Sequence, residues 1–141
     1  MIIADTNVVS EFMKDAPDPA VLAWARELDR AALSICVVTV EEIERGIGRL
    51  APGRRRAGLE ARWKAHLDAF ADTIASYDLP AARAAAGVLV HAEFSGRAIS
   101  HGDAQIAGIC LAHGHELATR NVRDFAHLPG LAVVDPFDRP E

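Results

Sequence analysis

Short apolar segments alternate with longer amphipathic segments along the chain. The short segments are runs of β-branched and other apolar residues, a pattern typical of buried strands, and they cover residues 2–3, 33–38, 73–77, 116–119 and 131–134. The longer segments carry apolar residues at helical spacing and cover residues 8–13, 19–28, 40–50, 54–72, 80–94 and 100–113. Strands separated by helices pair in parallel through crossover connections. The pattern therefore predicts a three-layer α/β/α sandwich with a five-stranded parallel sheet.

Proline, glycine and aspartate mark several of the predicted helix ends. Pro19 is well placed as the first residue of a helix, with Asp18 as its N-cap. Pro80 opens another helix, which Gly96 interrupts. Gly114 fits the left-handed position just past the end of the last long helix. These residues support the helix boundaries that the apolar spacing predicts.

Length and composition predict one domain, residues 1–141, with a formal net charge of −5. An acidic total argues against unspecific coating of nucleic acid, although a local basic patch remains compatible with it. Cys36 and Cys110 lie inside apolar segments, so we expect two buried free thiols in a reducing compartment. We expect no signal peptide, because Asp5 interrupts the N-terminus and no basic lead precedes it. Since no apolar run approaches the ~18 residues of a membrane span, we expect a cytoplasmic protein without a membrane partner.

Three predicted helix starts share one polar pattern, a capping residue followed three positions later by a carboxylate. The pairs are Thr39–Glu42, Ser100–Asp103 and Asn121–Asp124. A purely structural interpretation is available, because in a capping box the acid reaches back to the N–H of the cap and favours the positive helix end. Such a box stabilises a helix by about 0.5–2 kcal/mol. Asp5 stands apart from this pattern, since it ends the first strand outside any such box.

The predicted sheet brings these acids together. In a parallel sheet the strand-to-helix turns lie at one edge, so Asp5, Glu42 and Asp124 are expected to meet there. The helix that begins at Ser100 presents Asp103 to the same edge. Crowded carboxylates in a partly desolvated cleft repel one another unless a cation holds them. Ligands that are all oxygen suit Mg²⁺ or Mn²⁺, whereas Zn²⁺ prefers histidine or cysteine, and Mg²⁺ held against a phosphodiester supports its hydrolysis.

Four motifs occur in order along the chain and are followed by a closing Pro-Gly-Leu before the last strand. They are Ile-Ile-Ala-Asp5-Thr-Asn, Thr39-x-x-Glu42, Ile99-Ser-x-x-Asp103-Ala-Gln-Ile-Ala and Leu117-Ala-Thr-Arg-Asn121-x-x-Asp124-Phe. Together they resemble the motifs of PIN domains, most closely those of VapC-type toxins of bacterial toxin–antitoxin pairs. Four motifs in order are a strong signal, whereas Asp-Thr-Asn alone would be a weak one. The resemblance runs from residue 2 to about 135. It implies a five-stranded parallel sheet flanked by helices and a Mg²⁺-dependent ribonuclease.

The resemblance also assigns roles to individual residues. The implied acidic pocket consists of Asp5, Glu42, Asp103 and Asp124, and the implied supporting polar groups are Thr6, Asn7 and Asn121. Asp5 and Asp103 are the expected direct metal ligands, with Glu42 beside them at the metal. Because Asn121 and Asp124 lie in the same motif, which of them completes the pocket stays open. The family further implies a homodimer that acts on RNA and is inhibited by a cognate antitoxin.

One stretch of this acidic chain is basic, and it contains Arg54, Arg55 and Arg56. Arginine suits contacts to phosphate, so RNA binding is one interpretation of the stretch. An acidic antitoxin surface and a solvated helix face are the other two.

Two functions of other classes compete with the ribonuclease. The first is a non-catalytic PIN-like module that works only within a protein or nucleic-acid complex and whose acids merely cap helices. Retention of all four acids argues against it, because a capping role accepts serine, threonine or asparagine as readily. The second is a phosphatase-like hydrolase with Asp5 as nucleophile. That chemistry commonly needs a second aspartate two residues later, where this chain has Asn7.

Overall fold

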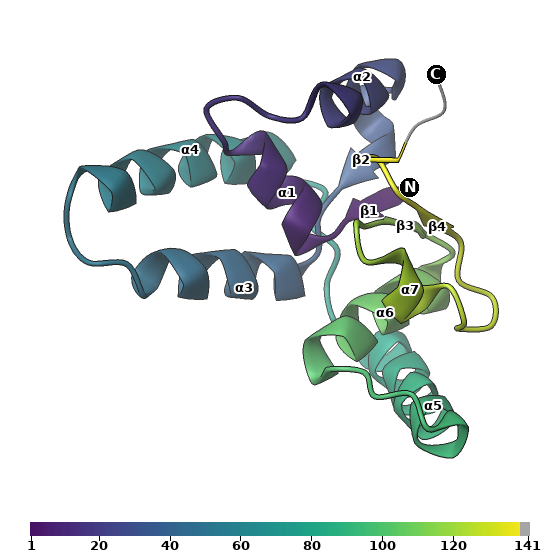
Figure 1. Cartoon of the computed structure of the whole chain (residues 1–141). Helices are drawn as coiled ribbons and strands as arrows, with labels where there is room; N and C mark the ends of the chain where they lie inside the picture. Colours follow the sequence, from purple (N-terminus) through teal and green to yellow (C-terminus); the bar gives the residue numbers. More distant parts are fainter. Residues whose placement is uncertain (139–141) are drawn as a thin grey trace.

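A parallel sheet lies at the centre of the fold. The computed structural model describes residues 1–138 and arranges four strands in the order β2–β1–β3–β4 (Figure 1). The strands are β1 (Ile2–Ala4), β2 (Leu33–Ser34), β3 (Glu116–Ala118) and β4 (Val133–Val134). Every pair in this sheet is parallel. The predicted α/β architecture with a parallel sheet is thus confirmed.

Helices cover both faces of the sheet (Figure 1). They are α1 (Thr6–Phe12), α2 (Pro19–Glu27), the short 3-10 helix η1 (Arg30–Ala32), α3 (Val37–Gly48), α4 (Arg54–Phe70), α5 (Leu79–Ser95), α6 (His101–His113) and α7 (Val122–Phe125). Side chains of the central strands alternate between two hydrophobic cores. Ile3 and Leu117 belong to the core with α5 and α6, whereas Ala4 and Ala118 belong to the core with α1 to α4. Both faces of the sheet are therefore buried, as in a three-layer sandwich.

The fifth strand predicted over residues 73–77 is not confirmed. This segment makes one isolated parallel bridge, between Cys36 and Ala75. The two backbone hydrogen bonds of Ala75, to the residues on either side of Cys36, are both 2.9 Å long. Pairing does not extend further, because α3 begins at Val37 and α5 begins at Leu79. Within residues 1–138 the sheet therefore has four strands, and this bridge lies beside its β2 edge.

The strand predicted over residues 33–38 is shorter than expected, and the helix after it starts earlier. Extended backbone was expected as far as Val38, but α3 already begins at Val37. The preference of β-branched residues for strands depends on their packing, and here Val38 is buried against the core as part of a helix. Thr39 consequently lies inside α3, fully buried, with its hydroxyl 3.8 Å from Cys36 Sγ. It does not cap the helix, so the predicted capping pair with residue 42 is wrong.

Several helix ends follow the prediction. Asp18 caps α2 by accepting a hydrogen bond from the backbone N–H of Ala20 at 2.8 Å, with Pro19 as the first helical residue. Gly96 and Gly114 end α5 and α6 in the left-handed conformation, with φ of 67° and 70°. These ends are local events, and local residue chemistry determines them.

Two further expectations can be compared with the structure. Cys36 and Cys110 are both buried free thiols, as predicted. Among the described helices, none is long and apolar enough to cross a membrane.

A close contact between α5 and α6 determines where the first turn of α6 lies. A Cβ atom added at Gly108 would lie 2.5 Å from the carbonyl oxygen of Ala81 and 2.9 Å from the Cβ of Ala85. Only glycine permits this approach, because any side chain would collide with the backbone of α5. The contact holds α6 against α5 and thereby positions Asp103 near the sheet edge.

Candidate active site

Asp5 lies at the carboxyl end of β1, where the chain turns into α1. Its backbone N–H donates to the carbonyl oxygen of Ala118 at 2.8 Å, which ties this turn to β3. Its Oδ1 accepts a hydrogen bond from the backbone N–H of Thr6 at 2.8 Å. Asp5 is therefore the N-cap of α1, a role that the strand pattern did not predict. The side chain is almost fully buried.

Thr119, at the end of β3, holds the other oxygen of Asp5. The Thr119 hydroxyl donates to Asp5 Oδ2 at 2.8 Å and accepts from the backbone N–H of Asn121 at 3.1 Å. Asn7 Nδ2 lies 3.3 Å from both Asp5 Oδ2 and Thr119 Oγ1. The amide oxygen of Asn7 accepts from the backbone N–H of Arg120 at 3.1 Å. This network fixes the orientation of the Asp5 carboxylate.

Sequence reasoning did not identify Thr119, although a usable signal existed. Thr119 directly follows β3 just as Asp5 directly follows β1. Because β1 and β3 are adjacent and parallel, polar residues at their carboxyl ends must lie close together. The predicted supporting role of Asn7 has a definite contact here. Asn121 contributes its backbone N–H to the network, and its side chain does not cap α7.

Glu42 reaches the same place from the second turn of α3. The hydroxyl of Thr6 donates to Glu42 Oε2 at 2.7 Å. The other carboxylate oxygen lies against the first turn of α6, since a Cβ atom added at Gly102 would stand only 2.8 Å from Glu42 Oε1. The absence of a side chain at residue 102 thus leaves the space that the carboxylate occupies.

Asp103 lies in the first turn of α6, where its backbone N–H donates to the hydroxyl of Ser100 at 3.1 Å. Burial, together with the charges of Asp5, Glu42 and Asp124, raises the pKa of Asp103 to about 6. Burial raises the pKa of Asp5 as well, against the lowering effect of its hydrogen bonds, and the charge of Asp124 adds to the rise. Four carboxylates from four segments of the chain therefore share one electrostatic environment.

Helix capping does not account for all of these acids. Ser100 caps α6 through its hydroxyl, as predicted. Thr39 lies inside α3, and Asn121 precedes α7 without a side-chain cap. The positions of Glu42 and Asp124 consequently need another explanation.

The acids form a set of oxygen ligands, which suits a hard divalent cation such as Mg²⁺. As the side chains stand, no three histidine, cysteine, aspartate or glutamate residues within 1–138 are arranged to hold a metal ion. Hydrogen bonds occupy both oxygens of Asp5 and one oxygen of Glu42. Burial is the largest cause of the raised pKa of Asp103, and a cation would relieve the repulsion from the other acids that adds to it. The set therefore fits a cation in chemistry and charge, and Asp5, Asp103 and Glu42 are the residues that would hold it.

A groove of about 390 Å³ adjoins the acids between α1, α3 and α4. Thr6 and Glu42 line it together with Arg55 and several apolar side chains, among them Ile47 and Leu59. The groove thus joins an acidic site to an apolar surface.

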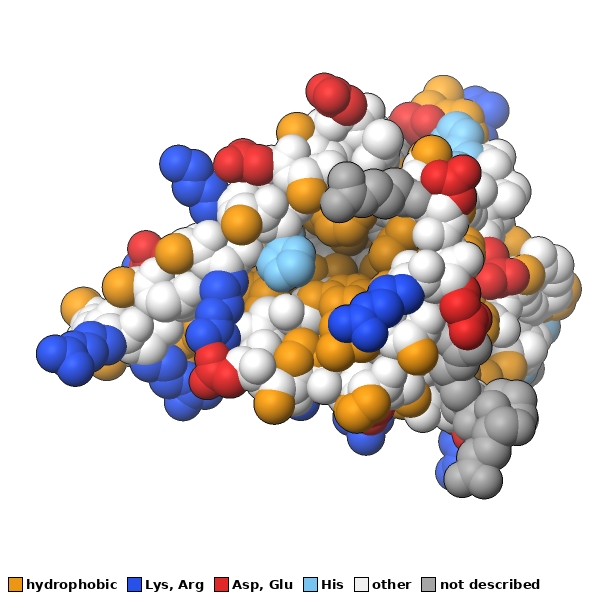
Figure 2. All heavy atoms as spheres, turned by 90° about the horizontal axis from the view of Figure 1, so that it is seen from above, with side chains coloured by type: hydrophobic (Ala, Val, Ile, Leu, Met, Phe, Trp, Pro, Cys, Tyr) orange, Lys and Arg blue, Asp and Glu red, His pale blue; other side chains and the backbone are white. Residues whose placement is uncertain are grey.

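The predicted RNA-binding arginines do not share one environment. Lys and Arg side chains gather around the end of the hairpin that α3 and α4 form (Figure 2). Arg56 is engaged within the protein, because it donates to Glu60 at 2.7 Å and to the carbonyl oxygen of Leu50 at 3.1 Å. Arg55 lines the groove, and Arg54 is exposed. RNA binding by these arginines stays a prediction, with Arg55 the best placed.

Comparison with known proteins identifies the family. The family model described as "PIN domain" matches residues 2–131. VapC ribonuclease Y4jK of Sinorhizobium fredii is 36% identical over 139 residues, which cover 98% of this chain and 99% of that protein. Toxin FitB of Neisseria gonorrhoeae is 31% identical over 138 residues, which cover 97% of this chain and 99% of that protein. The chain therefore belongs to the PIN domain family.

Solved structures agree with this assignment. The crystal structure of FitAcB from Neisseria gonorrhoeae matches with a TM-score of 0.88 and 31% identity, covering 97% of this chain and 99% of that chain. A member of the VapBC family of toxin–antitoxin systems, VapBC-5 from Mycobacterium tuberculosis, matches with a TM-score of 0.67 and 26% identity, covering 94% and 96% of the two chains. The resemblance to PIN-domain, VapC-type toxins is thus confirmed over nearly the whole chain.

Proposed function

We propose that this protein is the toxin of a toxin–antitoxin pair and acts as a Mg²⁺-dependent endoribonuclease. The observation that carries the proposal is the convergence of Asp5, Glu42, Asp103 and Asp124. Burial, together with the charges of the other three acids, raises the pKa of Asp103 to about 6. Relatives of this chain named as a ribonuclease and as a toxin support the reaction class. Hydrolysis of an RNA phosphodiester bond is the chemistry that such a set of carboxylates serves with a divalent metal.

Each acid has a distinct part in the proposed reaction. Three donors hold Asp5, which would be the metal ligand with the least freedom, and Asp103 and Glu42 would hold the metal with it. When bound, Mg²⁺ supplies positive charge to the scissile phosphate and makes a water molecule more acidic. Glu42 or Asp124 would orient the attacking water. Thr6, whose hydroxyl bonds Glu42, controls where the Glu42 carboxylate points.

The proposed partners are a cognate antitoxin, the RNA substrate and a second copy of this chain. Structural neighbours from toxin–antitoxin systems support the antitoxin. The groove beside Glu42 offers an apolar surface for a protein, and Arg55 within it offers a contact for RNA phosphate. A cytoplasmic location is part of the same proposal.

Cleavage of single-stranded RNA by the purified protein tests the function. We expect cleavage in Mg²⁺, loss of cleavage in EDTA, and recovery when Mg²⁺ or Mn²⁺ is restored. Asp5→Asn and Asp103→Asn should lower kcat at least 100-fold, about the cost of removing one catalytic group. Asp72→Asn is the matched control, because Asp72 is exposed after the end of α4. On expression, the wild type and Asp72→Asn should arrest growth, whereas Asp5→Asn and Asp103→Asn should not.

The non-catalytic module makes the opposite prediction. If the wild type neither cleaves RNA with any divalent cation nor arrests growth, the ribonuclease proposal is refuted. Equal activity of the wild type and Asp103→Asn would refute the role of the acids while leaving a nuclease in place.

A further inference from the structure

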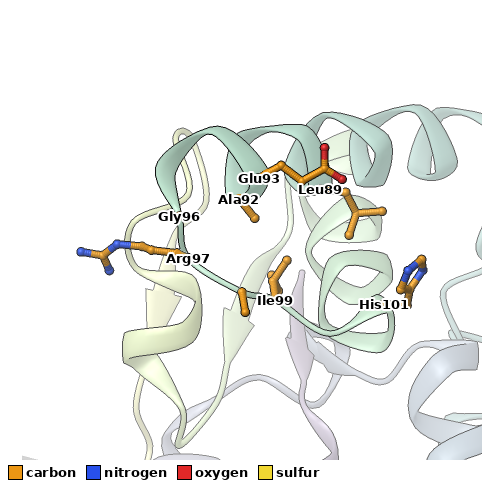
Figure 3. A pocket seen from close by; sticks show the side chains of 8 residues that line it. Leu89, Ala92, Glu93, Gly96, Arg97, Ile99 and His101 are labelled. Atoms are coloured by element: carbon orange, nitrogen blue, oxygen red, sulfur yellow. The ribbon is translucent and has the colours of Figure 1, made fainter.

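A slot of about 370 Å³ lies between the end of α5 and the segment that leads into α6 (Figure 3). Its volume is within the range of about 300–1,000 Å³ that is usual for small-molecule sites. Leu89 and Ala92 project from α5 toward the segment below, and Ile99 projects from that segment toward them (Figure 3). The slot therefore has apolar walls on two opposite sides, a shape that fits a flat group.

Polar groups lie at the edge of this slot. Glu93 and His101 line it, and the Glu93 carboxylate turns toward the side of Leu89, whereas Arg97 points away (Figure 3). Across residues 1–138, no hydrogen bond or ion pair engages the side chain of Glu93 or His101. A flat ligand in the slot would meet apolar walls on its faces and free carboxylate oxygens at its edge.

The slot and the proposed catalytic acids flank the first turn of α6. His101 is the first residue of α6 and lines the slot, and Asp103 lies two residues further on, on the other side of the same helical turn. Between them Gly102 lies against Glu42. An RNA strand that passes over the first turn of α6 would therefore reach both the acids and the slot.

Resting on the proposed ribonuclease function, we infer that this slot binds a guanine base of single-stranded RNA next to the cleaved bond. An unstacked base is recognised by contacts to its faces and by hydrogen bonds to its Watson–Crick edge. Guanine presents two adjacent donors on that edge, N1–H and N2–H, which match the two oxygens of the Glu93 carboxylate as an arginine fork does. Adenine and cytosine present one amino group there, and uracil presents one N–H. Leu89, Ala92 and Ile99 supply the surface for the faces of the base.

Binding of mononucleotides, followed through the methyl NMR signals of Leu89, Ala92 and Ile99, tests the slot without requiring catalysis. All four nucleoside 5′-monophosphates carry the same phosphate, so any difference among them reports the base. We expect GMP to shift these methyl signals at concentrations about tenfold lower than AMP, CMP or UMP. Glu93→Gln should remove this difference, because an amide presents one acceptor and one donor in place of two acceptors. Asp72→Asn should retain it.

A substitution that fills the slot is the second test. Ala98 lines the slot and is exposed, so Ala98→Phe should leave folding intact, as a thermal melt would verify, and block the GMP response. In cleavage assays on short RNAs that differ only beside the cut, the wild type should prefer guanine by about tenfold, and both variants should lose that preference.

The outcomes separate the two proposals. A selective GMP response in a protein that cleaves no RNA would support the slot and refute the ribonuclease. Cleavage without base preference, or equal methyl shifts with all four nucleotides, would overturn the slot. Shifts with N-acetyl-arginine amide and none with GMP would also overturn it, in favour of a guanidinium group from a protein partner.

Discussion

Gly102 offers a direct test of how closely the site is packed. In Gly102→Ala, the new Cβ would stand 2.8 Å from Glu42 Oε1. Ordinary contacts begin near 3.4 Å, so the carboxylate must retreat by about 0.6 Å, which exceeds the ~0.5 Å within which catalytic groups are held. A misplacement of this size lowers kcat by about 10- to 100-fold.

Stability should respond differently. The clashing atom is the end of a flexible side chain, so the fold can absorb the change by moving Glu42. Alanine is favoured over glycine within helices by up to about 1 kcal/mol, which for a chain of this size corresponds to a Tm about 2–4 °C higher. We therefore expect Gly102→Ala to lose activity with an unchanged or slightly raised Tm.

The assay combines RNA cleavage kinetics with thermal melts. Gly58→Ala is the matched control, because Gly58 lies within α4 and an added Cβ there meets no atom within 4 Å. Glu42→Asp shortens the side chain by one methylene and withdraws the carboxylate from residue 102. Adding Gly102→Ala to Glu42→Asp should therefore cost little further activity. Wild-type kcat in Gly102→Ala, or losses that multiply in the double variant, would refute the reasoning.

Three more predictions concern one residue of the site and two packing positions outside it. Thr119→Val removes the hydroxyl that donates to Asp5 and should lower kcat at least tenfold, whereas Thr119→Ser should retain activity. Equal kcat in both variants would contradict the role of this hydroxyl in positioning Asp5. Gly108→Ala places a Cβ 2.5 Å from the Ala81 carbonyl oxygen and should lower the free energy of unfolding in urea by about 1–3 kcal/mol. Gly87→Ala is the control, because an added Cβ there meets no atom within 4 Å. Similar urea midpoints for the two variants would refute the tight contact. Burial lowers the pKa of His66, so the unfolded state takes up its proton first as the pH falls through 6.5, and stability is lost in that direction. His66→Gln should therefore gain Tm relative to the wild type between pH 7.5 and pH 5.5, and a constant difference across that range would contradict the assignment.

The sequence by itself predicted the alternation of strands and helices, several helix ends and the four acids as candidates. Local chemistry is sufficient for these features, because Pro19 and Gly114 restrict the backbone where they stand. Asp5 was identifiable because it ends an apolar strand, and the other three acids because each follows a capping residue by three positions at a predicted helix start. Parallel topology followed from the alternation of strands and helices and placed Asp5 and Asp103 at one edge.

Only the tertiary structure decided how far each element extends and what surrounds the acids. Val37 and Val38 are β-branched and favour a strand, yet α3 begins there because packing outweighs that preference. The segment at Ala75 pairs through one bridge because the elements beside it turn helical at once. Thr119 and Gly102 lie 114 and 97 positions from Asp5 in the sequence, so their contacts with the acids arise only when β3 and α6 pack beside β1 and α3. The sequence thus supplied the chemical groups, and the fold supplied their distances.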